Sequence, residues 1–289
     1  MTRAPVRLAF SPDSDDIFMF WALLNGKVDT EGLSFTSERA DTETLNRMAE
    51  NPEAGADVSA VSIAHYARVA KDYLLLPHGM SVGRGYGPVI VSLTKGVKLS
   101  NLRGKRIGVP GTRTTAFLVT KLLLADFEPV VVPIAPYSKA FDELKAGAID
   151  AALLIHEGRL FYEREGTHKV ADIGEEWARV TNGLPLPLGG NAIRRALGED
   201  GVARVSRVCR ASIRWAADHA DEVTRALLDA ETRADVGLDR ASLDKYLDMY
   251  ANTDTLDAPP DVRRAIDELF ERGRAAGLLP NDARAEFAP

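Results

Sequence analysis

Apolar and polar positions alternate along the first two thirds of the chain in a way that predicts strands and helices in turn. Short apolar runs predict the strands, and segments with helical periodicity separate them. This alternation is typical of parallel sheets flanked by helices. The expected strands cover residues 6–10, 33–37, 57–62, 73–76 and 88–93, and the expected helices cover 16–24, 42–50 and a segment after residue 62.

The pattern begins again after Lys95 as a second unit of strands and helices. Strands are expected at 130–132 and 151–155, and helices at 114–125 and 139–146. From about Arg195 the strand signal almost disappears. The remaining chain is expected to form consecutive helices at 202–217, 221–232, 240–250 and 261–276.

This order of elements predicts an α/β protein with two lobes and a helical C-terminal segment. The chain is expected to cross between the lobes near 92–97 and again near 188–192. Lobe I then contains residues 1–94 and 191–289, with the helical tail packed on it, and lobe II contains residues 95–190. The architecture resembles the type II periplasmic-binding-protein fold, in which a hinge closes two lobes over a ligand cleft.

Composition and charge narrow the classes of function. A chain of 289 residues with 45% hydrophobic and 27% charged residues is typical of an ordinary globular protein. The net charge of −6, without any run of five basic residues, argues against a nucleic-acid partner. No apolar window approaches the roughly 20 residues of a membrane span, and the N-terminus lacks the apolar segment of a secretory signal. We therefore expect a cytoplasmic protein without a membrane partner.

His156 is the first candidate for chemistry because it directly follows the apolar run 151–155. Such a run predicts a strand buried on both faces, and in open α/β sheets the carboxyl ends of strands face the ligand crevice. Imidazole ionises near neutral pH, so His156 is a candidate general base. The alternative is a packing or turn residue. Glu157 and Arg159 either position its ring or face solvent as a surface ion pair.

Two junctions between a strand and a helix carry polar residues suited to line the cleft. The first, residues 11–18, offers the N–H groups of a helix start to a carboxylate or hydroxyl, unless Asp15 or Asp16 caps them. The second, residues 111–116, offers hydroxyls and backbone donors to an anionic or polyhydroxylated ligand. Its alternative is an ordinary helix with a threonine N-cap.

Two further segments are weaker candidates for the cleft. The glycines of 83–87 allow the backbone to approach a ligand or another chain segment closely. Ser62 ends a short strand and is expected to face the cleft, although a serine there is commonly a turn residue.

Other chemistries have no support in the sequence. The other four histidines are scattered without the spacing of a zinc site, so we predict no metal. Neither a nucleophile elbow nor a Cys-His arrangement occurs, so covalent nucleophilic catalysis is not expected. The single cysteine, Cys209, cannot form an internal disulfide and is expected to be a core residue of the helix 202–217.

Seven segments, in this order and at these separations, resemble the 1,4-dihydroxy-6-naphthoate synthase family of the futalosine route to menaquinone. They fall within roughly residues 6 to 195, and the helical tail fits the family's length. The segments are 11–18, 44–46, 83–88, 109–116, 154–157, 172–174 and 183–189.

The resemblance implies a lyase that uses no cofactor and acts on a small carboxylated substrate. It converts cyclic dehypoxanthinylfutalosine to 1,4-dihydroxy-6-naphthoate and releases dihydroxyacetone. His156 falls on the family's catalytic histidine, which removes a substrate hydroxyl proton before carbon–carbon cleavage, and the aromatic ring that forms supplies driving force. Ser62, Thr115 and Ala116 fall on family substrate-binding positions, and Ala60 and Val61 extend the first of these. The segments suited to line the cleft add the candidate binding residues Ser11, Asp16, Gly83, Arg84 and Thr114.

The chain departs from the family at the first loop and at residue 60. The family usually writes the loop as Ser-Pro-Cys-Pro-Asn-Asp-Thr-Phe, whereas this chain has Asp13, Ser14, Asp15 and Ile17 at four of those places. It also has Ala60 where the family commonly has lysine. An added acid and a lost cation would each weaken attraction for a carboxylated substrate, by about 1 kcal/mol or more if desolvated.

These departures keep two alternatives open. One is a non-catalytic binding protein for a small carboxylate or metabolite that uses the same cleft. The other is chorismate dehydration by the related enzyme of the same pathway and fold, although the segment 155–157 favours the naphthoate synthase. The sequence also leaves open whether the protein forms a homodimer.

Overall fold

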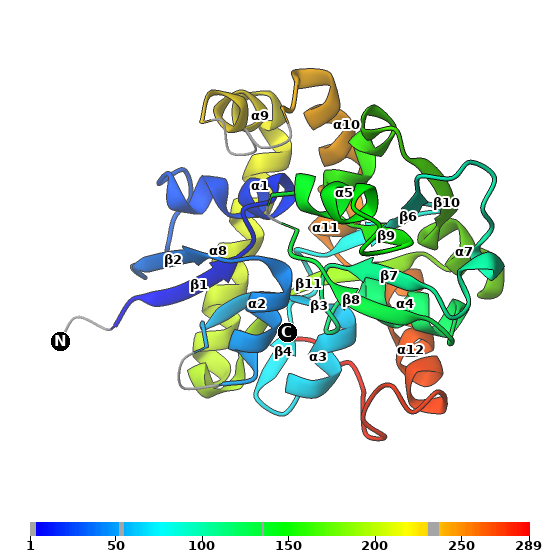
Figure 1. The fold of residues 1–289 in the computed structure, drawn as a ribbon. Coiled ribbons are helices and arrows are strands. Elements are labelled where there is room, and N and C mark those ends of the chain that lie inside the picture. The colour runs from blue at the N-terminus through cyan, green and yellow to red at the C-terminus, as the bar shows by residue number, and fades with distance from the viewer. Residues whose placement is uncertain (1–3, 52–54, 135, 231–236) are drawn as a thin grey trace.

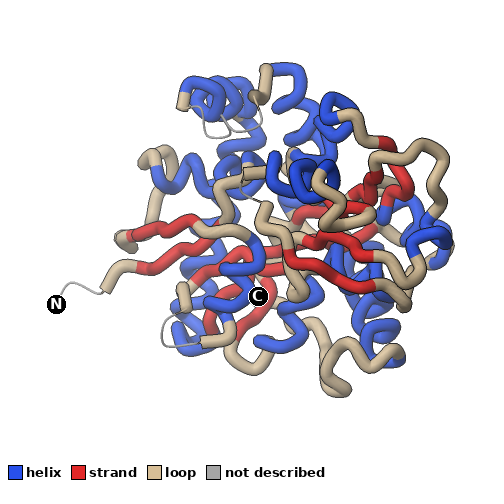
Figure 2. Tube along the Cα trace, in the orientation of Figure 1, coloured by secondary structure: helices blue, strands red, loops and turns tan. Residues whose placement is uncertain are grey.

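The computed structural model describes residues 4–51, 55–134, 136–230 and 237–289, which form two α/β lobes joined side by side (Figure 1). Each lobe contains one sheet, and helices cover the sheets (Figure 2). Two lobes of this kind are the predicted architecture, and that prediction is confirmed.

The sheet of the first lobe has the strand order β2-β1-β3-β11-β4, with β5 beside β11. β1 pairs in parallel with β2 and β3, whereas β11 is antiparallel to β3, β4 and β5. The strands are β1 (Val6–Phe10), β2 (Phe35–Arg39), β3 (Val58–Ser62), β4 (Tyr73–Leu75), β5 (Ser81–Gly83) and β11 (Leu186–Arg194).

The helices of the first lobe come from both ends of the chain. α8 packs on α1 and buries a stripe at helical spacing that includes Val202, Val205 and Cys209, as expected for this cysteine. Burial raises the pKa of the Cys209 thiol to about 12. The helices are α1 (Ser14–Leu24), α2 (Thr42–Ala49), α3 (Ile63–Val69), η3 (Arg195–Leu197), α8 (Gly198–Asp218), α9 (Ala220–Asp229), α10 (Arg240–Tyr250), α11 (Thr253–Leu256) and α12 (Pro260–Ala275).

The sheet of the second lobe has the order β10-β6-β9-β7-β8. β9 is parallel to β7 but antiparallel to β6, and β6 is antiparallel to β10. Its strands are β6 (Val89–Ser92), β7 (Arg106–Val109), β8 (Glu128–Val131), β9 (Ala151–Leu154) and β10 (His168–Asp172). Its helices are η1 (Leu99–Leu102), α4 (Thr115–Leu123), α5 (Ser138–Lys145), α6 (Gly158–Phe161), η2 (Tyr162–Glu165) and α7 (Ile173–Val180).

Each predicted element has a counterpart, but two inferences from the pattern were wrong. Both sheets are mixed rather than parallel, because β11 and β6 run against their neighbours. The first crossing between the lobes lies earlier in the chain than expected, because β6 belongs to the second sheet. The second crossing also lies earlier than expected, because all of β11 belongs to the first sheet. The end of the predicted helix 221–232 lies outside the described residues.

The two crossings lie next to each other, because β5 and β11 pair immediately beside them. The glycine-rich segment 83–87 forms the first crossing, and two of its glycines, Gly83 and Gly87, lie in close contact with neighbouring backbone. A Cβ atom on Gly83 would lie 1.9 Å from the carbonyl oxygen of Tyr86, and one on Gly87 would lie 2.9 Å from the backbone nitrogen of Gly174. The crossing is therefore closely packed.

Across the described ranges, none of the helices combines the length and apolar character that a bilayer crossing needs.

Candidate active site

A cavity with about 720 Å³ of empty space, part of it open to solvent, lies where the two lobes meet. Its walls come from α1, α2, β3, α10 and the start of β11 in the first lobe, and from the start of α4 and the end of β9 in the second. The lining residues with side-chain polar groups are Asp15, Asp16, Thr42, Ser62, Ser81, Thr114, Thr115, His156, Tyr246 and Tyr250.

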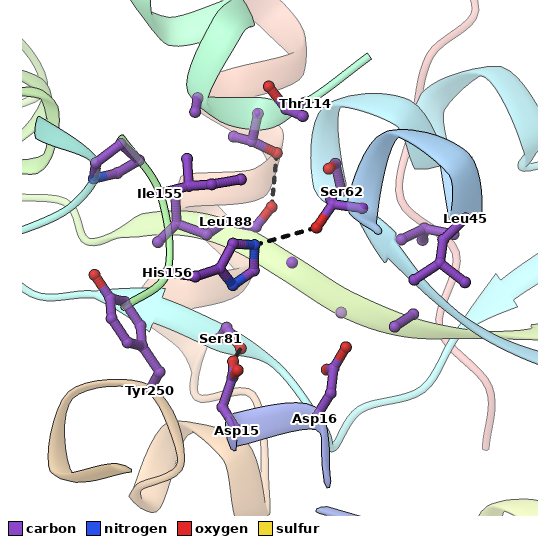
Figure 3. A pocket seen from close by; sticks show the side chains of 18 of the residues that line it. Asp15, Asp16, Leu45, Ser62, Ser81, Thr114, Ile155, His156, Leu188 and Tyr250 are labelled. Atoms are coloured by element: carbon purple, nitrogen blue, oxygen red, sulfur yellow. Dashed lines mark hydrogen bonds between the residues drawn. The ribbon is translucent and has the colours of Figure 1, made fainter. Parts of the chain in front are cut away.

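The first turn of α1 supplies the acidic wall of the cavity. Figure 3 shows Asp15 and Asp16 projecting from this turn toward His156. Asp15 accepts hydrogen bonds from the Ser81 hydroxyl at 2.7 Å and the Tyr246 hydroxyl at 2.9 Å, and Asp16 accepts one from the backbone N–H of Ser11 at 2.8 Å. Burial, with Asp15 as a charged neighbour, raises the pKa of Asp16 to about 7, and burial also raises the pKa of Asp15. These carboxyls therefore keep protons more readily than ordinary aspartates.

His156 lies just beyond β9, at the base of the cavity (Figure 3). Its Nε2 is 3.1 Å from the Thr42 hydroxyl across the gap between the lobes. On the other side of the ring, Nδ1 is 3.3 Å from the Asp13 carboxylate and 3.4 Å from the Tyr246 hydroxyl. The side chain is 20% exposed, so one face of the imidazole remains open to the cavity.

The charges around His156 favour its protonated form. Burial alone would lower its pKa, but the carboxylates of Asp13, Asp15, Glu157 and Asp16 outweigh that effect, so the pKa is raised above its usual value. A histidine with a raised pKa is a stronger base once it is deprotonated. The arrangement therefore suits proton removal from a hydroxyl that lies beside the ring.

The opposite wall is built from the starts of α3 and α4. Ser62 precedes α3, and its backbone N–H donates to the Asn46 side chain at 2.9 Å. The Thr114 side chain caps α4 by accepting a hydrogen bond from the backbone N–H of Phe117. A threonine N-cap was the alternative that the sequence offered for this segment. The Thr115 hydroxyl donates to the Leu188 carbonyl at 2.7 Å. Two helix N-termini thus face the same space, where the helix dipoles favour an anion, while the N–H groups of Ser62, Ala64 and Phe117 are already bonded within the protein.

The structure brings most of the expected site residues together around this cavity. His156, Asp16 and the two predicted groups 60–62 and 114–116 all line it. Ser11, Gly83 and Arg84 do not. Ser11 lies behind Asp16, to which it donates its N–H.

Arg84 is held away from the cavity by two carboxylates on the C-terminal helices. Its guanidinium makes ion pairs with Asp254 and with Asp261, each at 2.7 Å. Together with the packing of Gly83 at the crossing, these contacts give the segment 83–87 a role in joining the lobes to the helical tail.

Several residues that line the cavity could not be identified as site residues from the sequence. Thr42 and Ser81 are single hydroxyls at the ends of ordinary elements. Tyr246 and Tyr250 are four residues apart on α10, so they share one helix face, and that spacing was the only available hint. They reach the site because the helical tail folds back against α1, which the local pattern does not encode.

The described lining residues include neither lysine nor arginine, so an anionic group in the cavity would depend on backbone N–H groups and hydroxyls. Within the described part of the chain, no cluster of three or more His, Cys, Asp or Glu side chains is arranged to hold a metal ion.

A family model and two similar proteins place this chain in one family. A family described as menaquinone biosynthesis matches residues 6–275. The chain is 37% identical over 284 residues to a 1,4-dihydroxy-6-naphthoate synthase from Streptomyces coelicolor, covering 97% of this chain and 96% of that protein. It is 35% identical over 282 residues to a protein of the same name from Thermus thermophilus, covering 98% of each.

Solved structures give the same fold. A crystal structure of an Archaeoglobus fulgidus protein superposes with a TM-score of 0.85 at 40% identity, over 95% of this chain and 98% of that one. The alkanesulfonate-binding protein of Xanthomonas axonopodis superposes with a TM-score of 0.70 at 15% identity, over 97% of this chain and 96% of that one. The second likeness concerns the fold alone and agrees with the expected binding-protein architecture.

Proposed function

The chain belongs to the menaquinone-biosynthesis family, and from that premise we propose that it is a carbon–carbon lyase of the 1,4-dihydroxy-6-naphthoate synthase type. Its substrate would be cyclic dehypoxanthinylfutalosine, and its products 1,4-dihydroxy-6-naphthoate and dihydroxyacetone. The proposal rests on the position of His156 in the inter-lobe cavity. It is supported by the identity of over a third between this chain and two proteins of that name.

His156 would act as the general base. A substrate hydroxyl bound beside the ring would give its proton to the imidazole, and the electrons left on oxygen would drive cleavage of the neighbouring carbon–carbon bond. The Thr42 hydroxyl, 3.1 Å from Nε2, marks where such a substrate hydroxyl would bind. Because Thr42 and His156 lie on different lobes, the lobes must meet for this arrangement to form.

The two walls would orient the substrate between them. The carboxyls of Asp15 and Asp16 would hold hydroxyl groups near His156, since oxygen acceptors and protonated carboxyls both bond to hydroxyls. The substrate carboxylate would lie against Ser62, Thr115 and the starts of α3 and α4, far from the acidic wall. Placing the carboxylate there compensates for Ala60, which leaves this wall without a cation.

The proposal is tested by incubating the purified protein with cyclic dehypoxanthinylfutalosine and following both products by mass spectrometry. A parallel reaction with chorismate tests the dehydratase of the same pathway. Formation of the naphthoate and dihydroxyacetone from the first substrate alone is the expected result. Conversion of chorismate, or binding of the first substrate without any turnover, would contradict the proposal.

A further inference from the structure

Asp13 is a charged residue of the first loop that the proposed chemistry does not yet use. Its side chain is fully buried and is not part of the cavity lining, so it does not meet a ligand there directly. Instead its carboxylate lies 3.3 Å from Nδ1 of His156. Asp13 therefore acts on the site through the histidine, and not on the substrate carboxylate as the sequence suggested.

Local structure fixes the position of Asp13. It is the N-cap residue of α1, with an extended backbone, and its carbonyl accepts the first helical hydrogen bond from Ile17 at 3.1 Å. Its backbone N–H donates to the Ser11 hydroxyl at 3.1 Å. Its side chain does not cap the helix: Oδ2 lies beside His156, and Oδ1 accepts a hydrogen bond from the Tyr137 hydroxyl at 3.5 Å. An N-cap aspartate normally uses its carboxylate on the helix itself, so this orientation calls for another role.

The second neighbour of Nδ1 is the hydroxyl oxygen of Tyr246, at 3.4 Å. That hydroxyl has one proton, and it donates this proton to Asp15 at 2.9 Å. Asp15 also accepts a hydrogen bond from the Ser81 hydroxyl, so the hydroxyls of Ser81 and Tyr246 both donate to the same carboxylate. The Tyr246 oxygen can then only accept from the imidazole.

The Tyr246 oxygen can only accept from Nδ1, and the negative charge of Asp13 lies within ion-pair distance of the same nitrogen, so Nδ1 carries the proton of the neutral ring. Nε2 then has a free lone pair, and its neighbour is the Thr42 hydroxyl, which can donate to it. We propose that Asp13 is a positioning residue: with the Tyr246 oxygen it holds the proton on Nδ1 of His156 and leaves Nε2 as the base. This inference rests on the proposed function only for the step in which Nε2 takes a substrate proton.

The carboxylates that face His156 all raise its pKa, and the other groups that face it are neutral hydroxyls. Asp13, Asp15 and Asp16 come from the start of α1, Glu157 follows His156 in the chain, and Tyr246 faces it from α10. The Thr42 side of the ring, on α2, is a neutral hydroxyl. Asp13 is the nearest carboxylate, so replacing it should remove the largest favourable charge interaction of the protonated ring.

The direct test is NMR of protein with ¹⁵N-labelled histidine, in wild type, Asp13→Asn and the matched control Glu38→Gln. A His156→Gln spectrum assigns the His156 signals. Glu38 is an exposed glutamate on β2, so its change also converts a carboxylate to an amide. We expect the Nδ1–H tautomer in the wild type at high pH. We also expect a pKa of His156 lower by roughly 1 unit in Asp13→Asn, because an opposite charge nearby shifts a pKa by about that much.

Kinetics provide the second readout. Activity requires neutral His156, so kcat/KM should rise with pH through the pKa of this residue. Asp13→Asn should move that rise to lower pH and reduce kcat about tenfold or more, since a weaker, less well held base loses part of its contribution. KM should change little, because Asp13 does not line the cavity.

The outcomes separate the two proposals. An Nε2–H tautomer in the wild type, or a His156 pKa that Asp13→Asn leaves unchanged, would overturn the role of Asp13 whatever the substrate. The tautomer measurement needs no variant, so it stands even if Asp13→Asn fails to fold. A protein that shows the expected tautomer and pKa shift, but converts no substrate, would contradict the lyase and leave the positioning role intact.

Discussion

His156 adopts a backbone conformation that is uncommon outside glycine, with φ of +50°. Non-glycine residues with positive φ carry strain that the surrounding structure must hold, and they are frequent at functional sites. Here the left-handed turn directly after β9 allows the imidazole to lie between Asp13 and Thr42, which belong to the other lobe. The strand end predicted the position of this residue, but neither the turn nor its partners could be deduced from local pattern.

The two aspartates of the acidic wall differ in what the sequence could say of them. Asp16 was expected to meet the cleft and does line it. Asp15 was expected as a possible helix cap or as an acid in the cleft-lining loop; it lines the cavity and bonds to Ser81 and Tyr246, which are 66 and 231 residues away in the chain. Contacts over such separations depend on the whole fold, so the residue pattern around position 15 does not contain them.

Asp16→Asn should stabilise the protein at high pH. The pKa of Asp16 is raised to about 7 in the folded protein, from 3.8 in the unfolded reference, so the folded state binds this proton more tightly. The resulting penalty on folding is small below about pH 4, grows as the pH rises and is complete above the folded pKa. Urea unfolding should show a larger free energy of unfolding for Asp16→Asn near pH 8 and little difference near pH 4. An equal effect at both pH values would contradict the raised pKa.

The starts of four helices, α1, α2, α3 and α4, converge on the cavity. α1 brings its acids, while α3 and α4 bring hydroxyls and backbone N–H groups. These helices could be predicted from the sequence to within a few residues at their ends, because capping residues and periodicity are local signals. It did not reveal β10 or β11. β11 contains a proline and two glycines and begins just after Pro185, which hides its strand character.

Thr114→Ala should weaken both α4 and ligand binding. The change removes the side-chain acceptor for the N–H of Phe117, which costs about 1 kcal/mol of stability. It also loosens the helix start that faces the cavity, so KM should rise while kcat changes less. Thr114→Ser keeps the hydroxyl and serves as the control. Denaturant unfolding and steady-state kinetics would measure both effects, and equal behaviour of the alanine and serine variants would contradict the capping role.

In the whole molecule, hydrogen bonds and ion pairs join the two lobes. Glu157, in the second lobe, is completely buried and accepts hydrogen bonds from the backbone N–H of Ser14 at 3.1 Å and from its hydroxyl at 2.9 Å. On the other side of the cavity, Arg113 pairs with Glu43 at 3.4 Å and with Glu50 at 2.8 Å. The two lobes were foreseeable from the repeated pattern, whereas these partners, far apart in sequence, were not.

Glu157→Ala should loosen the closed form at the start of α1. The Ser14 N–H and hydroxyl would lose their buried acceptor, which costs about 1–3 kcal/mol for each group. Hydrogen exchange of the amides from Ser14 to Ile17 should become faster in the variant. Glu165→Ala is the matched control, because Glu165 is exposed and pairs with Lys145 of its own lobe. Unchanged exchange in Glu157→Ala would show that this contact does not hold the lobes together.

The role of His156 is tested by comparing His156→Asn with the wild type on cyclic dehypoxanthinylfutalosine, with binding measured by calorimetry and turnover by mass spectrometry. We expect a Kd within a few fold of the wild type, since His156 supplies only one of the many groups that line the cavity. We also expect a loss of turnover of about 10² or more, as for removal of a general base. Turnover that persists in His156→Asn would show that His156 is not the general base.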